Sequence, residues 1–231
     1  MILRLAVSLG IVVTLLLSYS VIVKKGWFSS FEVSELLDKY SEEEIEHFAS
    51  FAFSSGRVIK WKNNIRISLA SNSIITPDKL ASVKESIVAC VNQLNDLMEE
   101  VKVNIDSVQP NVKLTLKDSI SLNVKGFAPV FTSIFILPYP TATSGYIDVQ
   151  VKDLDLAEIN ATVFHEFSHL LGFHHNLELS QEYKWKYKSL FNPPSKTFVD
   201  SLDILVEEFT EYSAFDKAAI RIMYDKEVAM D

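Results

Sequence analysis

One stretch of this chain, Ala161–Asn176, constrains its fold and chemistry more than any other. It reads ATVFHEFSHLLGFHHN, and its fixed spacing involves His165, Glu166, His169, Gly172 and His175. On a helix, residues four apart lie on one face, so His165 and His169 can hold one ion together. Gly172 is where the helix must end, because glycine tolerates the left-handed conformation that reverses the chain. The reversal predicts that His175 returns to the same ion.

The residue types in this pattern indicate a catalytic zinc site. Three imidazoles with one open position are typical of catalytic zinc, whereas structural zinc takes four protein ligands. Glu166 directly follows the first ligand and can reach a water on the metal without binding the metal itself. Histidines bind a metal only when they are neutral, so activity should fall as the pH drops below their titration range. The predicted cofactor is therefore Zn²⁺.

Three alternatives stay open at this point. His174 is a rival for the third ligand, although the spacing of the motif favours His175. Glu207 or Glu208 is the third ligand in the second alternative, a gluzincin-type peptidase site. The third alternative is a non-catalytic, membrane-tethered zinc-binding or interaction module, but such a module has no need of a base at Glu166.

The pattern H-E-x-x-H-x-x-G-x-x-H resembles the motif of the metzincin superfamily of zinc peptidases and matches it at every defined position. With the strand around Trp61 and the C-terminal pattern, the chain from about Phe48 onward is also similar to a bacterial family of metzincin-like proteins of unknown function. The resemblance implies an endopeptidase that hydrolyses peptide or protein substrates, with Glu166 as general base. Asn176 departs from the residues usual after the third histidine, which leaves the subfamily and the substrate preference undetermined.

The resemblance also implies two features around the metal. Metzincins place a methionine turn beneath the zinc, and Met223 with Tyr224 is the candidate, since no other methionine lies between His175 and Met223. The competing interpretation is a final helix, because Ser213 looks like a helix cap. Zincins also pair extended substrate with an edge strand, for which the apolar run 127–137 is the candidate. An ordinary buried strand is an equally good interpretation of that run.

Composition narrows the choice of partners. The chain has 231 residues and a net charge of −8, which argues against nucleic acid as a partner because phosphate binding needs basic patches. Cys90 is the single cysteine, so the chain can form no internal disulfide. Cys90 lies on the apolar stripe of its predicted helix, which favours a buried residue over an inhibitory zinc ligand.

The N-terminus predicts a membrane segment. Residues Leu5–Val23 carry no charge and are just long enough to span a bilayer. An uncleaved signal anchor is favoured over a signal peptide, because apolar residues continue past the weak cleavage site. The predicted organisation is a signal anchor or signal peptide at 1–25, a helical linker or cover at 26–56 and a metzincin-like catalytic domain at 57–231. We therefore expect a membrane-anchored protein with an extracytoplasmic catalytic domain, or a secreted or periplasmic one after cleavage; its oligomeric state is undetermined.

The order of the predicted elements indicates an α/β (α+β) fold with a mixed sheet. The resemblance implies that this fold is zincin-like, with a mostly parallel twisted sheet, a long helix, a metal-binding helix and a C-terminal helical subdomain. Helices are expected within 31–40, 41–53, from Thr76 to about Met98, at Leu156–Leu171 and from Leu202. Strands are expected within 58–69, 101–108, 111–117, 127–137 and 146–151.

Two residue patterns outside the motif allow further predictions. His47 lies on the polar side of its helix and is expected to be solvated rather than a metal ligand. Tyr183, Trp185 and Tyr187 alternate with lysines, which favours a two-faced surface strand or loop over a basic aromatic rim that contacts lipid or substrate.

Overall fold

The computed structural model describes residues 36–54, 57–105, 108–120, 124–133, 141–193 and 211–225. The segment Leu5–Val23, the helix expected from Leu202 and the end of the run 127–137 lie outside this part of the chain, so these stay predictions. Within the described residues, no helix is both long enough and apolar enough to cross a membrane.

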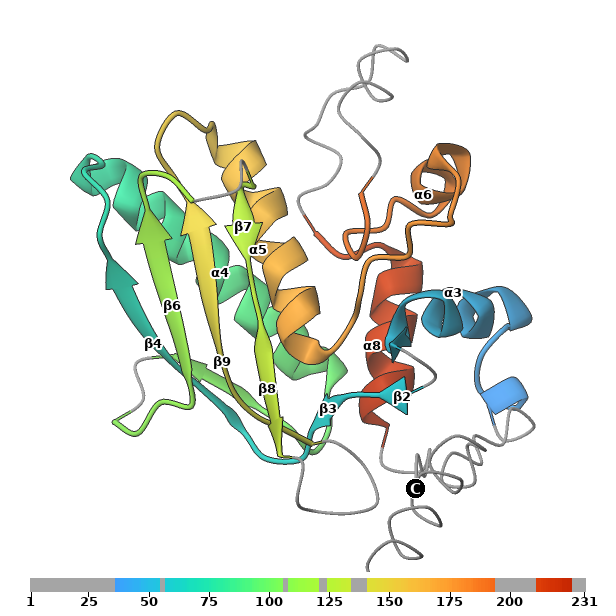
Figure 1. The fold of residues 1–231 in the computed structure, drawn as a ribbon. Helices are drawn as coiled ribbons and strands as arrows, with labels where there is room; N and C mark the ends of the chain where they lie inside the picture. Colours follow the sequence, from blue (N-terminus) through green and yellow to red (C-terminus); the bar gives the residue numbers. More distant parts are fainter. Residues whose placement is uncertain are drawn as a thin grey trace, which may run out of the picture.

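The centre of the fold is a mixed, mostly parallel sheet, which confirms the predicted mixed α/β class (Figure 1). Its strands are β3 (Lys60–Trp61), β4 (Ile65–Ser71), β5 (Val103–Ile105), β6 (Val112–Lys117), β7 (Gly126–Phe127), β8 (Val130–Ser133) and β9 (Thr141–Gln150). Neighbours along the order β3-β9-β6-β4-β5 pair in parallel, whereas β7 and β8 pair antiparallel with β9. A separate short hairpin joins β1 (Phe53–Ser54) to β2 (Arg57–Val58).

Two helices, α4 (Pro77–Leu97) and α5 (Leu156–Leu171), cover one face of the sheet (Figure 1). Thr76 caps α4 by accepting a hydrogen bond from Lys79 N. Alternate residues of the central strands are buried in the core: Ile65, Ile67, Leu114, Leu116, Ile147 and Val149. The predicted burial of Cys90 is confirmed, because its side chain is fully covered within this core. Helix α5, which carries the histidine motif, contacts both α4 and β9.

A second group of helices lies to the right of α5 in Figure 1: α3 (Glu42–Ala52), α6 (Gln181–Tyr187) and α8 (Ala214–Tyr224). Ser41 caps α3 in a capping box: its Oγ accepts from Glu44 N, and its backbone N–H donates to the Glu44 carboxylate. Helix α3 packs against α8, and its Phe48 and Phe51 belong to the same buried cluster as Phe167 of α5. The described part of the predicted helical cover therefore shares one core with the described residues of the predicted catalytic domain.

The prediction of a surface strand or loop after the motif is wrong, because α6 is a helix. Ser180 starts it by accepting a hydrogen bond from Tyr183 N at 3.1 Å. Tyr183 and Tyr187 then lie four residues apart on one helical face, with their ring centroids 4.4 Å apart. The alternation with lysines suggested a period of two, and the cap and the ring packing outweigh it.

The prediction of a solvated His47 is also wrong, because its side chain is fully buried. Its Nε2 atom lies 2.9 Å from Asp216 Oδ1. Aromatic rings surround the imidazole at centroid distances of 5.0 to 6.3 Å, from Phe51, Tyr183, Tyr187, Phe191 and Phe215. The polar side of α3 is covered at this point by α6 and α8, a tertiary contact that the periodicity of one helix cannot reveal.

The methionine-turn interpretation of Met223 and Tyr224 is wrong as well, because both residues lie in α8. Ser213 caps this helix by accepting from Asp216 N at 3.1 Å, and Met223 belongs to its buried face. The competing interpretation, a final helix, describes these residues. Since no other methionine lies between His175 and Met223, the chain departs from the metzincin pattern here.

Candidate metal centre and active site

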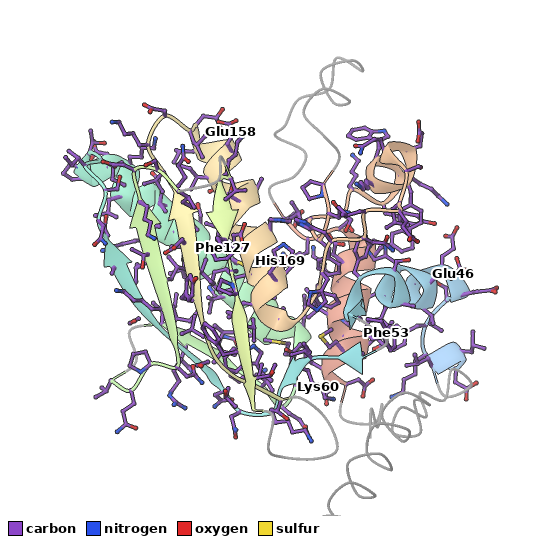
Figure 2. The ribbon with its side chains drawn as sticks, in the orientation of Figure 1. Glu46, Phe53, Lys60, Phe127, Glu158 and His169 are labelled. Carbon is purple, nitrogen blue, oxygen red and sulfur yellow. The ribbon has the colours of Figure 1, made fainter. Side chains whose placement is uncertain are left out.

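Helix α5 presents the first two histidines and the glutamate of the motif. It begins at Asp155, whose side chain accepts from Glu158 N at 2.8 Å while the Glu158 carboxylate bonds back to the Asp155 N–H. The bounds of α5, Leu156 to Leu171, are those predicted from the sequence. His165 and His169 therefore occupy successive turns of one face; Figure 2 labels His169 on the lower half of the helix.

Gly172 ends α5 in the left-handed conformation, with φ at +107°. Its N–H donates to His169 O at 3.0 Å, and the next N–H donates to Ser168 O at 3.1 Å, which closes the helix end. A Cβ at Gly172 would lie 1.9 Å from Ile59 O, so the position requires glycine for two independent reasons. The reversed chain brings His175 beside the two histidines of α5, as predicted.

The three histidines converge through their Nε2 atoms. His165 and His169 are 3.2 Å apart at these atoms, and His175 is 3.0 Å from each of them. A tetrahedral zinc with bonds of about 2.0–2.1 Å separates its nitrogen ligands by roughly 3.3 Å. The triangle of nitrogens is close to this size, so the residues fit one zinc ion and leave its fourth position open.

Backbone carbonyls fix the opposite ring nitrogens of two of these histidines. His165 Nδ1 lies 2.5 Å from Leu190 O, and His169 Nδ1 lies 2.8 Å from Phe173 O. A carbonyl only accepts, so both Nδ1 atoms carry the hydrogen and each Nε2 keeps a free lone pair. Burial lowers the pKa of His165 to about 3 and that of His169 to about 4, so both rings are neutral near pH 7. Two lone pairs that face each other at this distance repel unless a cation lies between them.

Glu166 is buried beside the histidines, with 3% of its surface exposed. Its Oε2 atom has no hydrogen-bond partner in the described part of the chain. Strand β7 closes over it, because a Cβ at Gly126 would lie 2.2 Å from Glu166 Oε1. Burial raises the pKa of Glu166 to about 8, so this carboxyl group can both hold and release a proton near neutral pH.

The apolar run 127–137 is described as far as Ser133, and this part belongs to the edge of the sheet. Within the described residues, β7 and β8 pair only with β9. Phe127 and Phe131 are 43% and 52% exposed, so the predicted edge position is confirmed for the described part of the run, and an ordinary buried strand is wrong there. Figure 2 shows Phe127 on β7, in front of α5.

Two aromatic side chains hold the C-terminal end of α5, where helical carbonyls lack partners within the helix. Trp61 Nε1 donates to Leu170 O at 2.6 Å. Tyr224 Oη donates to Leu171 O at 2.9 Å and accepts from Trp61 N at 3.4 Å. Tyr224 therefore anchors the metal helix from α8 rather than forming a turn.

Of the alternative third ligands, the structure describes His174 but not Glu207 or Glu208. His174 is not part of the three-histidine cluster; its N–H donates to Phe51 O at 2.9 Å, and its Nε2 is buried without a partner in the described chain. Asn176 ties the loop after the motif to α3, because its Nδ2 donates to Ser50 O at 3.1 Å. The alternative ligands Glu207 and Glu208 lie outside the described residues.

Sequence reasoning missed the residues that support His165. Leu190 contributes a backbone carbonyl, which leaves no signal in a sequence. Asp216 holds Leu190, yet in the sequence it reads as an ordinary acidic residue in the first turn of a capped helix. The sequence places Phe51 one helical turn after His47, but this spacing alone does not indicate that His47 is buried.

No protein-family model matches the chain, and the search of curated proteins found no match. Among solved structures, two of myroilysin are similar: one at 20% identity and TM-score 0.39 over 72% of this chain and 96% of that chain, the other at 17% and 0.38 over 77% and 96%. High choriolytic enzyme 1, a hatching enzyme zinc-protease from Oryzias latipes (medaka fish), is similar at 10% identity and TM-score 0.40, over 72% of this chain and 94% of that chain. Similarity of this extent does not establish a shared function.

Proposed function

We propose that this protein is a zinc-dependent endopeptidase of the metzincin type. The observation that carries the proposal is the convergence of three histidine Nε2 atoms, 3.0 to 3.2 Å apart, beside a buried glutamate. Three imidazole ligands and an open fourth position are typical of catalytic rather than structural zinc. A site without turnover would not need a buried carboxyl group beside the three histidines with an oxygen that has no partner in the described part of the chain.

The residues divide the work of peptide hydrolysis. His165, His169 and His175 would hold the zinc ion, which supplies a Lewis acid that activates water and polarises the scissile carbonyl. Glu166 accepts the proton of the attacking water at Oε2, the oxygen that has no hydrogen-bond partner among the described residues. The same carboxyl group then delivers this proton to the leaving amine nitrogen as the C–N bond breaks.

Strand β8 offers a docking edge for an extended substrate. It pairs antiparallel with β9, and within the described chain its other side has no strand partner. A peptide backbone can add to such an edge through main-chain hydrogen bonds. Because the neighbouring strand β7 lies against Glu166, a peptide along this edge would pass close to the catalytic residues. Backbone recognition of this kind supports cleavage within a chain.

The proposed localisation of the protein is inferred from the apolar segment Leu5–Val23 alone. If the segment is an uncleaved anchor, the catalytic domain is tethered to a membrane on its extracytoplasmic side. Mass spectrometry of the mature N-terminus distinguishes the anchor from a cleaved signal peptide, because only cleavage removes these residues.

The proposal is tested by metal analysis and cleavage of a broad peptide library, with Glu166→Ala as the paired variant. We expect about one zinc per chain in both proteins and hydrolysis only in the wild type. A wild-type chain that binds zinc and cleaves no peptide would instead support the non-catalytic binding module. A chain that binds no zinc would overturn both interpretations.

A further inference from the structure

Asp216 is a buried carboxylate at the start of α8 with both oxygens in use. Its Oδ2 accepts from Leu190 N at 2.8 Å. Its Oδ1 accepts from Ser189 Oγ at 2.7 Å and lies 2.9 Å from His47 Nε2. A carboxylate only accepts, so the His47 ring donates from Nε2. The three donors come from two separate parts of the chain, α3 and the loop after α6.

The loop that Asp216 holds is also the loop that supports a metal ligand. Leu190 donates its N–H to Asp216 and accepts from His165 Nδ1 through its carbonyl at 2.5 Å. Ser189 Oγ, which donates to Asp216, also accepts from Phe191 N at 3.2 Å. The carboxylate therefore fixes this stretch of backbone at two consecutive residues. One hydrogen-bonded chain runs from His47 through Asp216 and Leu190 to His165.

Core packing alone does not explain this arrangement. Asp216 and His47 are both 0% exposed, and a buried polar pair of this kind adds little stability over apolar residues of similar volume. An apolar side chain at position 216 could fill the space, but it would leave the Leu190 N–H without an acceptor. The Asp216 carboxylate instead holds the backbone at Leu190, whose carbonyl accepts from His165 Nδ1.

We propose that Asp216 is a positioning residue for the metal ligand His165, acting through the Leu190 carbonyl, and that His47 holds Asp216 in place. The inference rests on the proposed three-histidine metal site. Outer partners of metal-bound histidines set the ring orientation and raise ligand basicity, and their loss typically costs roughly 10–100-fold in metal affinity or activity. In this chain, the Leu190 carbonyl is the direct partner of His165, and Asp216 supports His165 through Leu190 without touching it.

The test compares Asp216→Ala with Ser213→Ala in the full chain. Zinc affinity is measured by competition with a chelator, and the cobalt-substituted proteins are compared by their visible absorption at saturating Co²⁺. Ser213 caps the same helix, because its Oγ accepts from Asp216 N. Ser213→Ala removes this cap and leaves the bond between Asp216 and Leu190 in place. It therefore controls for loosening of the start of α8.

We expect Asp216→Ala to weaken zinc binding by about 10–100-fold and to change the cobalt spectrum. Ser213→Ala should keep wild-type affinity and spectrum. Unchanged affinity and spectrum in Asp216→Ala would overturn the proposal, and so would an equal loss of affinity in both variants. These readouts need no hydrolysis, so a wild type that binds zinc without cleaving peptides would contradict the proposed function and leave this inference testable.

A milder variant keeps the test decisive if Asp216→Ala does not fold. Asp216→Asn preserves the side-chain volume and one acceptor, which can still receive the Leu190 N–H, but it loses the second acceptor oxygen. We expect an intermediate fall in zinc affinity with a measurable change in the cobalt spectrum. A wild-type affinity and spectrum for Asp216→Asn would overturn the proposal in that case.

Discussion

The two ring supports on the metal helix differ in origin. His169 Nδ1 donates to Phe173 O, which belongs to the turn that directly follows α5. His165 Nδ1 donates to Leu190 O, which lies 25 residues further along the chain and is held in turn by Asp216 of α8. One support is local and forms with the helix end, whereas the other exists only when the second group of helices has packed.

This difference separates what a motif specifies from what the rest of the fold must add. Gly172 and its neighbours encode the local support within the motif itself. The distant support involves α3, α6 and α8, which meet around the pair His47 and Asp216. The identity of the proposed ligands is therefore a local property of this chain, while the full geometry of the three-histidine cluster depends on long-range packing.

The largest effect is expected where a ligand is removed, because neither support can compensate for it. His175→Ala should lose more zinc affinity than the roughly 10–100-fold expected for a supporting residue, and it should lose hydrolysis. Zinc binding is measured by chelator competition, with the neighbouring His174→Ala as the control. A His175→Ala variant with wild-type zinc affinity and activity would support Glu207 or Glu208 as ligand.

The next largest effect is expected when both ring supports stay intact and only the general base is removed. Glu166→Gln keeps the size of the side chain and loses the base, so kcat should fall by roughly 10²–10⁴-fold. Zinc content should stay at the wild-type level, because this residue is not a ligand. Steady-state kinetics and metal analysis on the same preparation check both statements; a variant that retains wild-type kcat would remove Glu166 from the mechanism.

The local support breaks in Gly172→Ala. A left-handed backbone strains a residue with a Cβ by about 1–3 kcal/mol, and the close approach to Ile59 O adds to this cost. We expect a lower free energy of unfolding in urea and weaker zinc binding through displacement of Phe173. Gly145→Ala is the matched control, because its nearest contact would be 3.0 Å and its φ lies outside the left-handed region. Equal destabilisation by both changes would contradict the account of the helix end.

The smallest effect is expected at the anchor of the helix end. Tyr224→Phe leaves the terminal carbonyl of Leu171 without its buried donor, which should cost about 1–3 kcal/mol of unfolding free energy. The control is Tyr212→Phe, which removes a hydroxyl that donates to Phe164 O. This carbonyl lies inside the helix, so the loss of unfolding free energy should be about 1 kcal/mol. A reversed order in urea unfolding would show that the end of α5 does not depend on Tyr224.

Local signals made α5 predictable from the sequence. Its acidic start at Asp155, its pair of histidines four residues apart and its glycine end all lie within one short segment, and the predicted bounds match the structure. The presence of several strands followed from alternating apolar residues, since alternation is a property of each strand. Their mostly parallel arrangement rested on the order of strands and helices and on the resemblance. The edge position of β8 could be inferred only from the resemblance.

Long-range contacts set the limit of that prediction. His47 was expected in solvent, because one helix cannot show that α6 and α8 will cover its polar face. For Tyr224 the sequence allowed either a methionine turn or a final helix, since it cannot show that the hydroxyl donates to the end of α5 from α8. The Leu190 carbonyl could not be predicted at all, since a backbone atom of any residue can fill that role.

The coordination of zinc in the full chain tests the central claim most directly. X-ray absorption spectroscopy at the zinc edge reports the number of imidazole ligands and the bond lengths. We predict one zinc per chain with three imidazole nitrogens at about 2.0–2.1 Å and one further light-atom ligand. A chain that binds no zinc, or a zinc with only two imidazoles and a protein carboxylate, would contradict the three-histidine site.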